Sequence, residues 1–413
     1  MLKYLIVTDN KRIPYKAILH EINPNNIAFI VPKNLFDPQE KILARKEGLK
    51  IYEIDNYLEN GLIEKYCYDL YQDFAYDRLI AHAEKDILWA GKVRDLLKIK
   101  GQSYSSALTF RDKYLMKQLL SKNDFKTPYF AKIEAASDLI KFTQSQSFPI
   151  VIKPCRASAA TGIKILTNIK DMDEFIQECL TTTHESNWIA ESYINGTMYQ
   201  IDGIIEEGKV AFVWPSKSIN HWLDIKSGKV VGRYFLEPSH FLLKRLEEYS
   251  KKIVLLFPLE ENAIFHLEVF YEPNSDDFVF CEIASRVGGM RGRNVWLNSF
   301  GIDLGAEFIR SQAGLDFSLP IPQIAVPKFI DGYLLFPKKE GYIKNLPKHC
   351  SIQGIKEYKS FIEIDKNYRA SQNLSEISCL LTISALSEAE FLSKYEESLK
   401  WYEENYKWDT LQI

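Results

Sequence analysis

The stretch HLEVFYEPNSDDFVFCEIASRVGG (266–289) contains two apolar runs separated by a turn, a pattern that predicts an antiparallel β-hairpin. If the turn is centred near Ser275, Glu268 and Glu282 stand opposite each other, because both are equally far from that residue. The apolar neighbours Leu267 and Ile283 indicate buried strands, in which two facing carboxylates need a cation between them. A Mg²⁺ ion fits this pair. The alternative is an ordinary ion pair of one glutamate with Arg286 or a nearby lysine.

The N-terminal region, residues 1–107, alternates short apolar runs with helical patterns, as in YLIVTD (4–9), NIAFIVP (26–32) and KIYEI (50–54). Such alternation predicts a parallel sheet with helices on both faces, a small Rossmann-like domain. The motif GxGxxG is absent, so nothing in this domain indicates dinucleotide binding.

A second domain is expected over residues 108–325, beginning with the helical pattern RDKYLMKQLLSK (111–122). Its flap subdomain, about 125–190, contains the strand-like runs FPIVIKPC (148–155) and GIKILT (162–167). An Asp-x-x-Glu pattern at Asp171 predicts the start of a helix over 172–180.

The third domain, 326–413, follows three prolines that interrupt the chain, Pro320, Pro322 and Pro327. Its strand-like runs and one amphipathic helix predict a small α+β domain. The fold class is therefore a multidomain protein with α/β and α+β parts.

Composition excludes several classes of function. The chain has 413 residues, with 52 Lys and Arg against 55 Asp and Glu, and no basic stripe that would bind nucleic acid. No apolar stretch approaches the ~18 residues of a membrane span. The start, MLKYLIVTDN, turns polar too early for a secretory signal, so we expect a cytoplasmic protein. The six scattered cysteines indicate reduced thiols, mostly in the core, with neither a disulfide framework nor a zinc site.

Several basic residues are candidates for phosphate binding. Lys153 ends an apolar run beside the small-residue loop PCRASAATG (154–162), whose backbone N–H groups can approach an anion. Taken alone, Lys153 also fits a solvated strand-edge lysine and Lys113 an exposed helix lysine. Arg286 precedes a flexible turn and can bind carboxylate or phosphoryl oxygens, with pairing to Glu268 or Glu282 as the alternative.

Five passages, taken in order, resemble the ATP-grasp superfamily of carboxylate-amine ligases. The first four are AHAEKDILWAGKVRDLLKIKGQ with FRDKYLMK (81–117), FPIVIKPCRASAATGIKIL (148–166), WIAESYINGTMYQIDGII (188–205) and the hairpin 266–289. The fifth, GYLLFPKKEGYIKNLP (332–347), is similar to the terminal domain of the L-amino-acid ligase branch, although more loosely. The resemblance implies an ATP-grasp fold between the N-terminal Rossmann-like domain and the C-terminal α+β domain.

The resemblance also implies roles for individual residues. Those implied to bind ATP are Lys113, Lys153 and Ser158 at the phosphates, Glu191, Ser192, Tyr193 and Ile194 at the adenine, and Gln200 at the ribose. Glu268 and Glu282 would hold Mg²⁺, with Mn²⁺ as a substitute, and Arg286 and Arg293 would be catalytic. Two positions depart from the family: Met198 stands where a ribose-binding glutamate is common, and Ala284 where an asparagine often binds a second metal ion.

The activity implied is ATP-dependent formation of an amide or peptide bond through an acyl phosphate. The partners would be a small-molecule carboxylate, such as an amino acid, and an amine, in a chain compatible with a homodimer. One alternative acceptor is the thiol of an acyl carrier protein. An alternative of another class is a nucleotide-binding sensor without ligase activity, which the departures at Met198 and Ala284 favour.

Overall fold

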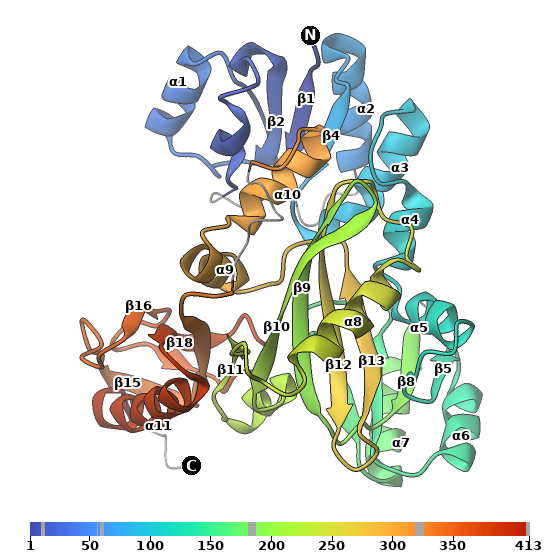
Figure 1. Cartoon of the computed structure of the whole chain (residues 1–413), viewed down its shortest axis with the longest axis vertical. Coiled ribbons are helices and arrows are strands. Elements are labelled where there is room, and N and C mark those ends of the chain that lie inside the picture. The colour runs from blue at the N-terminus through green and yellow to red at the C-terminus, as the bar shows by residue number, and fades with distance from the viewer. Residues whose placement is uncertain (10–12, 56, 58–61, 181–186, 319–325, 410–413) are drawn as a thin grey trace.

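The computed structural model describes residues 1–9, 13–55, 57, 62–180, 187–318 and 326–409 (Figure 1). Across these residues the strands form four sheets, which lie in the N-terminal region, the flap, the centre and the C-terminal tip. No helix in the described ranges is long and apolar enough to cross a membrane. All six cysteines are free thiols, and four of them are buried, as predicted.

The N-terminal region is a parallel sheet, as the alternation of strands and helices predicts. Its strands run in the order β3-β2-β1-β4. Their bounds are β1 Tyr4–Val7, β2 Ile27–Pro32, β3 Lys50–Ile54 and β4 Arg78–Ala81. The helices are α1 Pro38–Lys46, α2 Ile63–Phe74 and α3 Ile87–Leu97, with 3₁₀-helices η1 Tyr15–Ile18, η2 Pro24–Asn26 and η3 Glu84–Asp86. Their apolar sides enclose the two cores on either face of this sheet.

Two helices, α4 (Tyr104–Thr109) and α5 (Lys113–Ser121), lead into the flap. The flap sheet has the order β5-β8-β6-β7, with β5 Phe130–Ile133, β6 Ile150–Pro154, β7 Lys164–Leu166 and β8 Trp188–Ser192. Its helices are α6 (Ala136–Ser145) and α7 (Ile169–Cys179).

The start predicted for the second flap helix is wrong by three residues. Helix α7 begins at Ile169, because the Asn168 side chain, on extended backbone, accepts a hydrogen bond from the Asp171 N–H and caps the helix. Asp171 lies inside the first turn, where its carboxylate accepts from the Thr167 N–H at 2.7 Å.

The central sheet has eight strands in the order β13-β12-β9-β10-β11-β14-β18-β16. Their bounds are β9 Thr197–Glu206, β10 Lys209–Ile219, β11 Val231–Phe235, β12 Ala263–Glu272, β13 Asp277–Ala284, β14 Ile330–Pro337, β16 Ile355–Ser360 and β18 Ile377–Ala385. The associated helices are η4 Trp222–Ser227, α8 Leu243–Val254, α9 Gly292–Phe300, α10 Leu304–Ala313 and α11 Glu388–Asn405. A small sheet of β17 Asn367–Tyr368, β15 Gly341–Asn345 and β19 Lys407–Asp409 completes the C-terminal tip.

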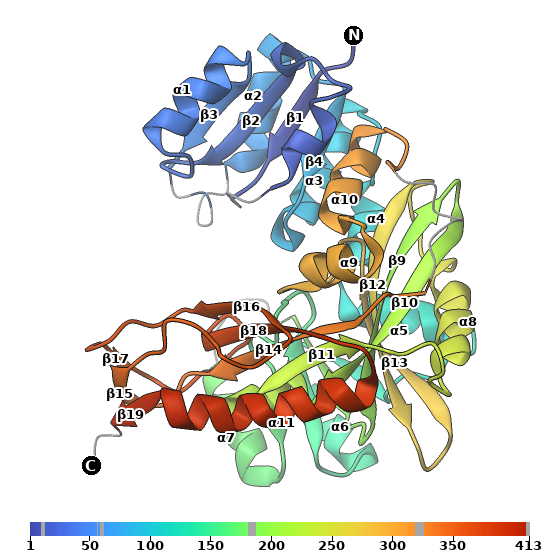
Figure 2. The ribbon, with the colours of Figure 1, turned by 60° about the vertical axis from the view of Figure 1, so that its left-hand side comes forward.

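The predicted three-part division stays a prediction, and its boundary near 325 lies outside the described residues. Two features connect the parts. The third part shares the central sheet, because β14 pairs with β11, and α11 runs lengthwise beside these strands (Figure 2). Helix α10 contacts the N-terminal region, where the Gln312 side chain bonds both backbone groups of Ala81.

The hairpin of β12 and β13 has the predicted pairing, with Glu268 opposite Glu282. The loop, however, spans 273–276, so its centre lies half a residue before Ser275. A β-bulge after Glu268, where Val269 pairs with Phe280, compensates for this offset. The bulge therefore brings the two glutamates into register.

Candidate active site

A cavity of about 780 Å³ lies where the N-terminal region, the flap and the central sheet meet. All twelve predicted site residues line it: Lys113, Lys153, Ser158, Glu191, Ser192, Tyr193, Ile194, Gln200, Glu268, Glu282, Arg286 and Arg293. Residues as distant in sequence as Glu84 and Tyr333 line the same space. Folding thus brings together motifs that are spread over most of the chain.

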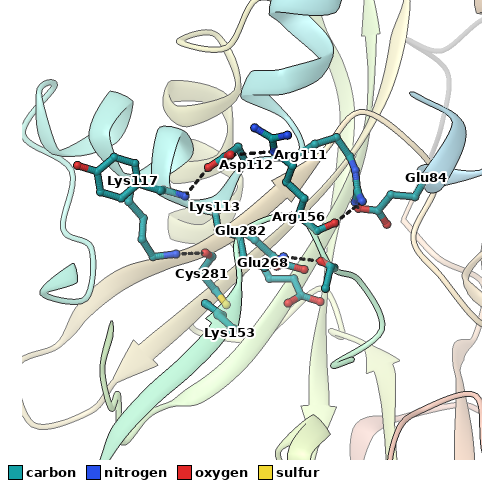
Figure 3. A network of polar contacts seen from close by, with 12 residues as sticks. Glu84, Arg111, Asp112, Lys113, Lys117, Lys153, Arg156, Glu268, Cys281 and Glu282 are labelled. Atoms are coloured by element: carbon teal, nitrogen blue, oxygen red, sulfur yellow. Dashed lines mark hydrogen bonds and ion pairs between the residues drawn. The ribbon is translucent and has the colours of Figure 1, made fainter. Parts of the chain in front are cut away.

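Glu282 carries a carboxylate that a lysine holds in its ionised form. Lys113 Nζ lies 3.0 Å from Glu282 Oε2 (Figure 3). Burial alone would raise the pKa of the Glu282 carboxyl, but the ammonium groups of Lys113 and Lys153 outweigh burial and lower it. The alternative of an exposed helix lysine is wrong for Lys113: the side chain is buried, because the residue begins α5 beside the cavity and donates to the Ala157 carbonyl at 2.7 Å.

Glu268, on β12, lies opposite Glu282 in the hairpin and contacts different partners. Gln200 Nε2 donates to Glu268 Oε1 at 3.1 Å, and His266 Nε2 lies 3.4 Å from the same oxygen. The other amide atom, Gln200 Oε1, is buried without a hydrogen-bond partner in the described part of the chain. Two carboxylates and a free amide oxygen are hard oxygen donors, so this corner fits a Mg²⁺ ion that takes its other ligands from phosphates and water.

The donor set is small. No group of three or more His, Cys, Asp or Glu side chains within the described ranges has the geometry of a metal site. Ala284, paired with His266 in the hairpin register, supplies no ligand.

Lys153 is fixed at the end of β6 by a buried ion-pair network. Its Nζ lies 2.8 Å from Glu191 Oε2, and Lys117 Nζ lies 2.9 Å from Glu191 Oε1. Lys117 also donates to the Cys281 carbonyl at 2.7 Å, which ties α5 to β13. Burial alone would lower the pKa of Lys153, but the Glu191 carboxylate outweighs it and raises this pKa, so the lysine stays charged. The alternative of a solvated strand-edge lysine is wrong for Lys153, since it is buried.

The small-residue loop between β6 and β7 lies beside these lysines. Ala159 and Ala160 have φ angles of 54° and 59°, which only a few residues other than glycine adopt. Ser158 lines the cavity here, and Arg156 pairs with Asp112, the residue that caps α5. The loop and the helix that begins with Lys113 are therefore held together.

The strand β8, which pairs with β6, and the residues after it also border the cavity. Ser192 pairs with Tyr129 through its backbone N–H at 2.9 Å and accepts from the Tyr129 N–H through its side chain at 3.0 Å. Tyr193 and Ile194 follow and line the cavity together with Met198. Their adenine-binding role stays a prediction.

Arg286 pairs with a residue that no sequence motif indicated. Its Nε donates to Glu84 Oε2 at 2.6 Å, and its Nη2 pairs with the same oxygen. Arg111 binds the other oxygen of Glu84 and donates to the Arg156 carbonyl at 2.5 Å. The alternative pairing of Arg286 with Glu268 or Glu282 is therefore wrong, because Glu84 from the N-terminal region takes this guanidinium.

Arg293 is also held by a carboxylate, since it forms an ion pair with Asp303. Its predicted catalytic role is untested by this geometry. Arg291 also lines the cavity and lies 2.5 Å from Glu357.

A second buried charge cluster, also missed by sequence reasoning, surrounds Asp202 on β9. Asp202 Oδ2 lies 2.8 Å from Arg233 Nη1, and Asp202 Oδ1 lies 2.7 Å from His266 Nδ1. Trp296 Nε1 donates to Asp202 at 3.4 Å. Burial alone would lower the pKa of His266, but Asp202 outweighs it and raises this pKa. The only sequence signal for this cluster is the alternation of side chains along a β-strand, which puts Asp202 on the same face of β9 as Gln200.

Comparisons with known proteins agree with this architecture. A family profile described as "Phosphoribosylglycinamide synthetase, ATP-grasp (A) domain" matches residues 111–241. The L-arginine-specific L-amino acid ligase of Bacillus subtilis is 21% identical over 385 residues, which cover 91% of this chain and 89% of the relative. A D-alanine–D-alanine ligase of Aquifex aeolicus is 25% identical over 264 residues, covering 60% of this chain and 87% of that protein.

Among solved structures, an L-amino acid ligase from Bacillus licheniformis superimposes with a TM-score of 0.75 at 16% identity, covering 100% of this chain and 99% of the other. The shared fold, the matched domain and the similarity over nearly the whole length lead to one conclusion: this chain belongs to the ATP-grasp superfamily.

Proposed function

We propose that the protein is an ATP-dependent ligase that joins the carboxylate of an amino acid to an amine through an acyl phosphate. The observation that carries the proposal is the convergence, in one cavity, of Lys113 and Lys153 with Glu268, Glu282 and Arg286. Transfer of a phosphoryl group requires mainly positioning and charge neutralisation, and this constellation offers both. The similarity to amino acid ligases of two species supports the choice of substrate class.

In this proposal, different residues of the cavity bind different parts of Mg²⁺-ATP. The two lysines and the loop around Ser158 bind the ATP phosphates, and Glu191 through Ile194 border the adenine. Glu268 and Glu282 hold Mg²⁺, for which Mn²⁺ can substitute. The bound metal ion neutralises phosphate charge during transfer.

Arg286 binds the negative charge that develops on the transferred group. Glu84 already orients the Arg286 guanidinium, so this group needs no reorganisation when the substrate binds. The acceptor amine then attacks the acyl carbon, phosphate leaves, and the amide bond forms. The cavity walls limit access of water, which would otherwise hydrolyse the acyl phosphate.

Trapping of the intermediate tests the proposal. The protein is mixed with ATP, MgCl₂, single L-amino acids and hydroxylamine, with no other amine present. We expect a hydroxamate from at least one amino acid, accompanied by ADP. Arg286→Ala should lower hydroxamate formation by about 10²–10³, the usual cost of one contact to a developing charge. Arg245→Ala, an exposed arginine paired with Asp276, is the matched control.

Two other results would point elsewhere. ATP binding without hydroxamate from any carboxylate would contradict the ligase and favour a nucleotide-binding sensor. Hydroxamate formation combined with transfer only to a phosphopantetheine thiol, and to no amine, would favour loading of a carrier protein.

A further inference from the structure

Arg233, in the middle of β11, has one guanidinium nitrogen, Nη2, without a hydrogen-bond partner in the described part of the chain. The side chain is 2% exposed. Nη1 lies 2.8 Å from Asp202 Oδ2 and donates to Ser216 Oγ at 3.4 Å. Nη2 is buried and has no hydrogen-bond partner within the described residues, although Arg233 lines the cavity. A buried N–H without an acceptor is costly and rare, so this nitrogen points to a ligand.

The Asp202 carboxylate fixes the orientation of the Arg233 guanidinium. Its Oδ2 contacts Arg233 Nη1 and Trp296 Nε1, and its Oδ1 contacts His266 Nδ1. The ring of Tyr333 on the neighbouring strand β14 packs 5.8 Å from the guanidinium carbon. The guanidinium is therefore held through Nη1 and packed against the Tyr333 ring, while Nη2 is buried without a hydrogen-bond partner in the described part of the chain.

Two glycines let the backbone approach Nη2 closely. A Cβ atom at Gly292 would lie 2.6 Å from Arg233 Nη2, and one at Gly288 would lie 3.0 Å from it. Gly288 lies in the turn that follows Arg286, and Gly292 begins α9 directly after that turn. The two arginines thus border the same turn, although their positions differ by more than fifty residues in sequence.

The positive charges in the cavity form two groups on opposite sides of the glutamate pair. Lys113 contacts Glu282 on β13, the edge strand of the sheet. Arg233 instead reaches back from β11 to Asp202 on β9, beside Glu268. Lys113 and Arg233 therefore pair with carboxylates on different strands of the sheet, Glu282 on β13 and Asp202 on β9.

We propose that Arg233 is a substrate-binding residue whose Nη2 donates to a carboxylate oxygen of the amino acid that the protein activates, and that Asp202 is the positioning residue that aims it. This inference rests on the proposed function, because that function assigns the lysine group to the ATP phosphates. Arg286 and Arg233 would then contact the reacting carboxylate from the two ends of one glycine turn.

Gly292→Ala tests the proposal without removing any charge. The new methyl group collides with the tip of Arg233 and with no other atom closer than 3.8 Å, so the flexible guanidinium must move. Arg233→Gln is the second variant, and Arg233→Gln with Asp202→Asn is a third that leaves no buried carboxylate unpaired. Arg245→Gln is the matched control, because Arg245 is an exposed arginine that pairs with Asp276 and is not among the residues that line the cavity.

Thermal melting of the full chain is measured with β,γ-imido ATP and MgCl₂, with and without each of the twenty standard L-amino acids. We expect at least one amino acid to stabilise the wild type further. In Gly292→Ala and Arg233→Gln its half-saturating concentration should rise at least tenfold, as expected for loss of a charge-assisted hydrogen bond. The half-saturating concentration of the ATP analogue should change less than twofold.

Three results would overturn the inference. The variants could lose affinity for the ATP analogue, which would place Arg233 at the phosphates. The variants could bind the amino acid as the wild type does, which would make Arg233 structural. The third result is that none of the twenty amino acids stabilises the wild type. If Arg233→Gln does not fold, the Gly292→Ala and double variants decide.

Release of ADP separates this inference from the proposed function. Amino-acid binding that depends on Arg233, but without ADP release, would keep the inference and contradict the ligase. ADP release that depends on an amino acid, with the same half-saturation in Gly292→Ala and wild type, would keep the ligase and contradict the role of Arg233.

Discussion

Glu282 is the residue on which the metal assignment depends most directly. Glu282→Gln keeps the size of the side chain and removes the charge that Mg²⁺ and Lys113 require. We expect turnover, measured as ADP release at ordinary Mg²⁺, to fall by about 10²–10³. Glu272→Gln, on the same hairpin and paired with the exposed Lys126, is the control and should keep its activity. Near wild-type turnover by Glu282→Gln would contradict the metal site.

Lys153 is expected to bind phosphate while it is held by Glu191. In Lys153→Met, ATP affinity and turnover should fall together, because a point charge is lost before and during the chemical step. Lys117 still neutralises Glu191 in this variant, so the fold should survive. Titration with ATP and a melting curve check both statements, and an unchanged ATP titration would leave Lys153 with a structural role only.

Individual residues differ in how well sequence alone reveals them. The pairing of Glu268 with Glu282 follows from a short turn between them, so local chemistry determines it. Arg286 and Glu84 are 202 positions apart, and no local pattern connects them. Lys117 was missed because it follows Lys113 on an ordinary helical pattern, and its burial depends on the Cys281 carbonyl across the domain.

Three elements meet at Glu191, since β8 carries the carboxylate, β6 carries Lys153 and α5 carries Lys117. Glu191→Gln would leave two buried ammonium groups without their counter-charge. We expect a loss of about 3–5 kcal/mol in the free energy of unfolding at pH 7. Urea denaturation measures this loss, and adding Lys117→Met should recover part of it. A loss below 1 kcal/mol would show that water reaches the network.

The same network predicts a pH dependence. Burial alone would raise the pKa of Glu191, but Lys117 and Lys153 outweigh it and lower this pKa below the value of 4.5 that the unfolded chain has. The pairing therefore stabilises the fold above pH 4.5, and this contribution is lost as the pH falls through the lower pKa of the folded state. The difference in stability between wild type and Glu191→Gln should shrink below pH 4.5, as urea titrations at pH 7 and at about pH 3.5 can determine.

At the level of elements, the parallel N-terminal sheet and the hairpin follow from the alternation of apolar residues. Two details do not. The bulge after Glu268 depends on how β12 fits between β9 and β13, and not on β12 alone. The start of α7 depends on the backbone of Asn168, where Asn and Asp compete as caps within four residues.

For the whole molecule, Glu84 joins the N-terminal region to the rest of the site through Arg286 and Arg111. In a double-mutant cycle, Glu84→Gln and Arg286→Gln should be coupled by about 0.5–3 kcal/mol in unfolding free energy, because they share one ion pair. Glu84→Gln and Arg245→Gln, which share no partner, should add within about 0.5 kcal/mol. Additivity of the first pair would mean that the contact does not connect the two regions.

The sequence predicts three domains, and this division stays a prediction, because composition does not reveal which strands share a sheet. The pairing of β11 with β14 is an example. The two strands are neighbours in one sheet, and no change in composition along the chain marks their contact. Long-range pairing of this kind is determined by the packing of Tyr234 and Leu334 in one core, which no local pattern reveals.

The position of β14 beside β11 also matters while the protein is being made. All five residues of β11 are buried in the complete fold, between β10 and β14. A nascent or proteolysed chain that ends before β14 would expose one edge of β11, with its row of unpaired N–H and C=O groups, to other chains. Such fragments should aggregate through that edge, so the chaperone demand of this protein should persist until β14 has left the ribosome.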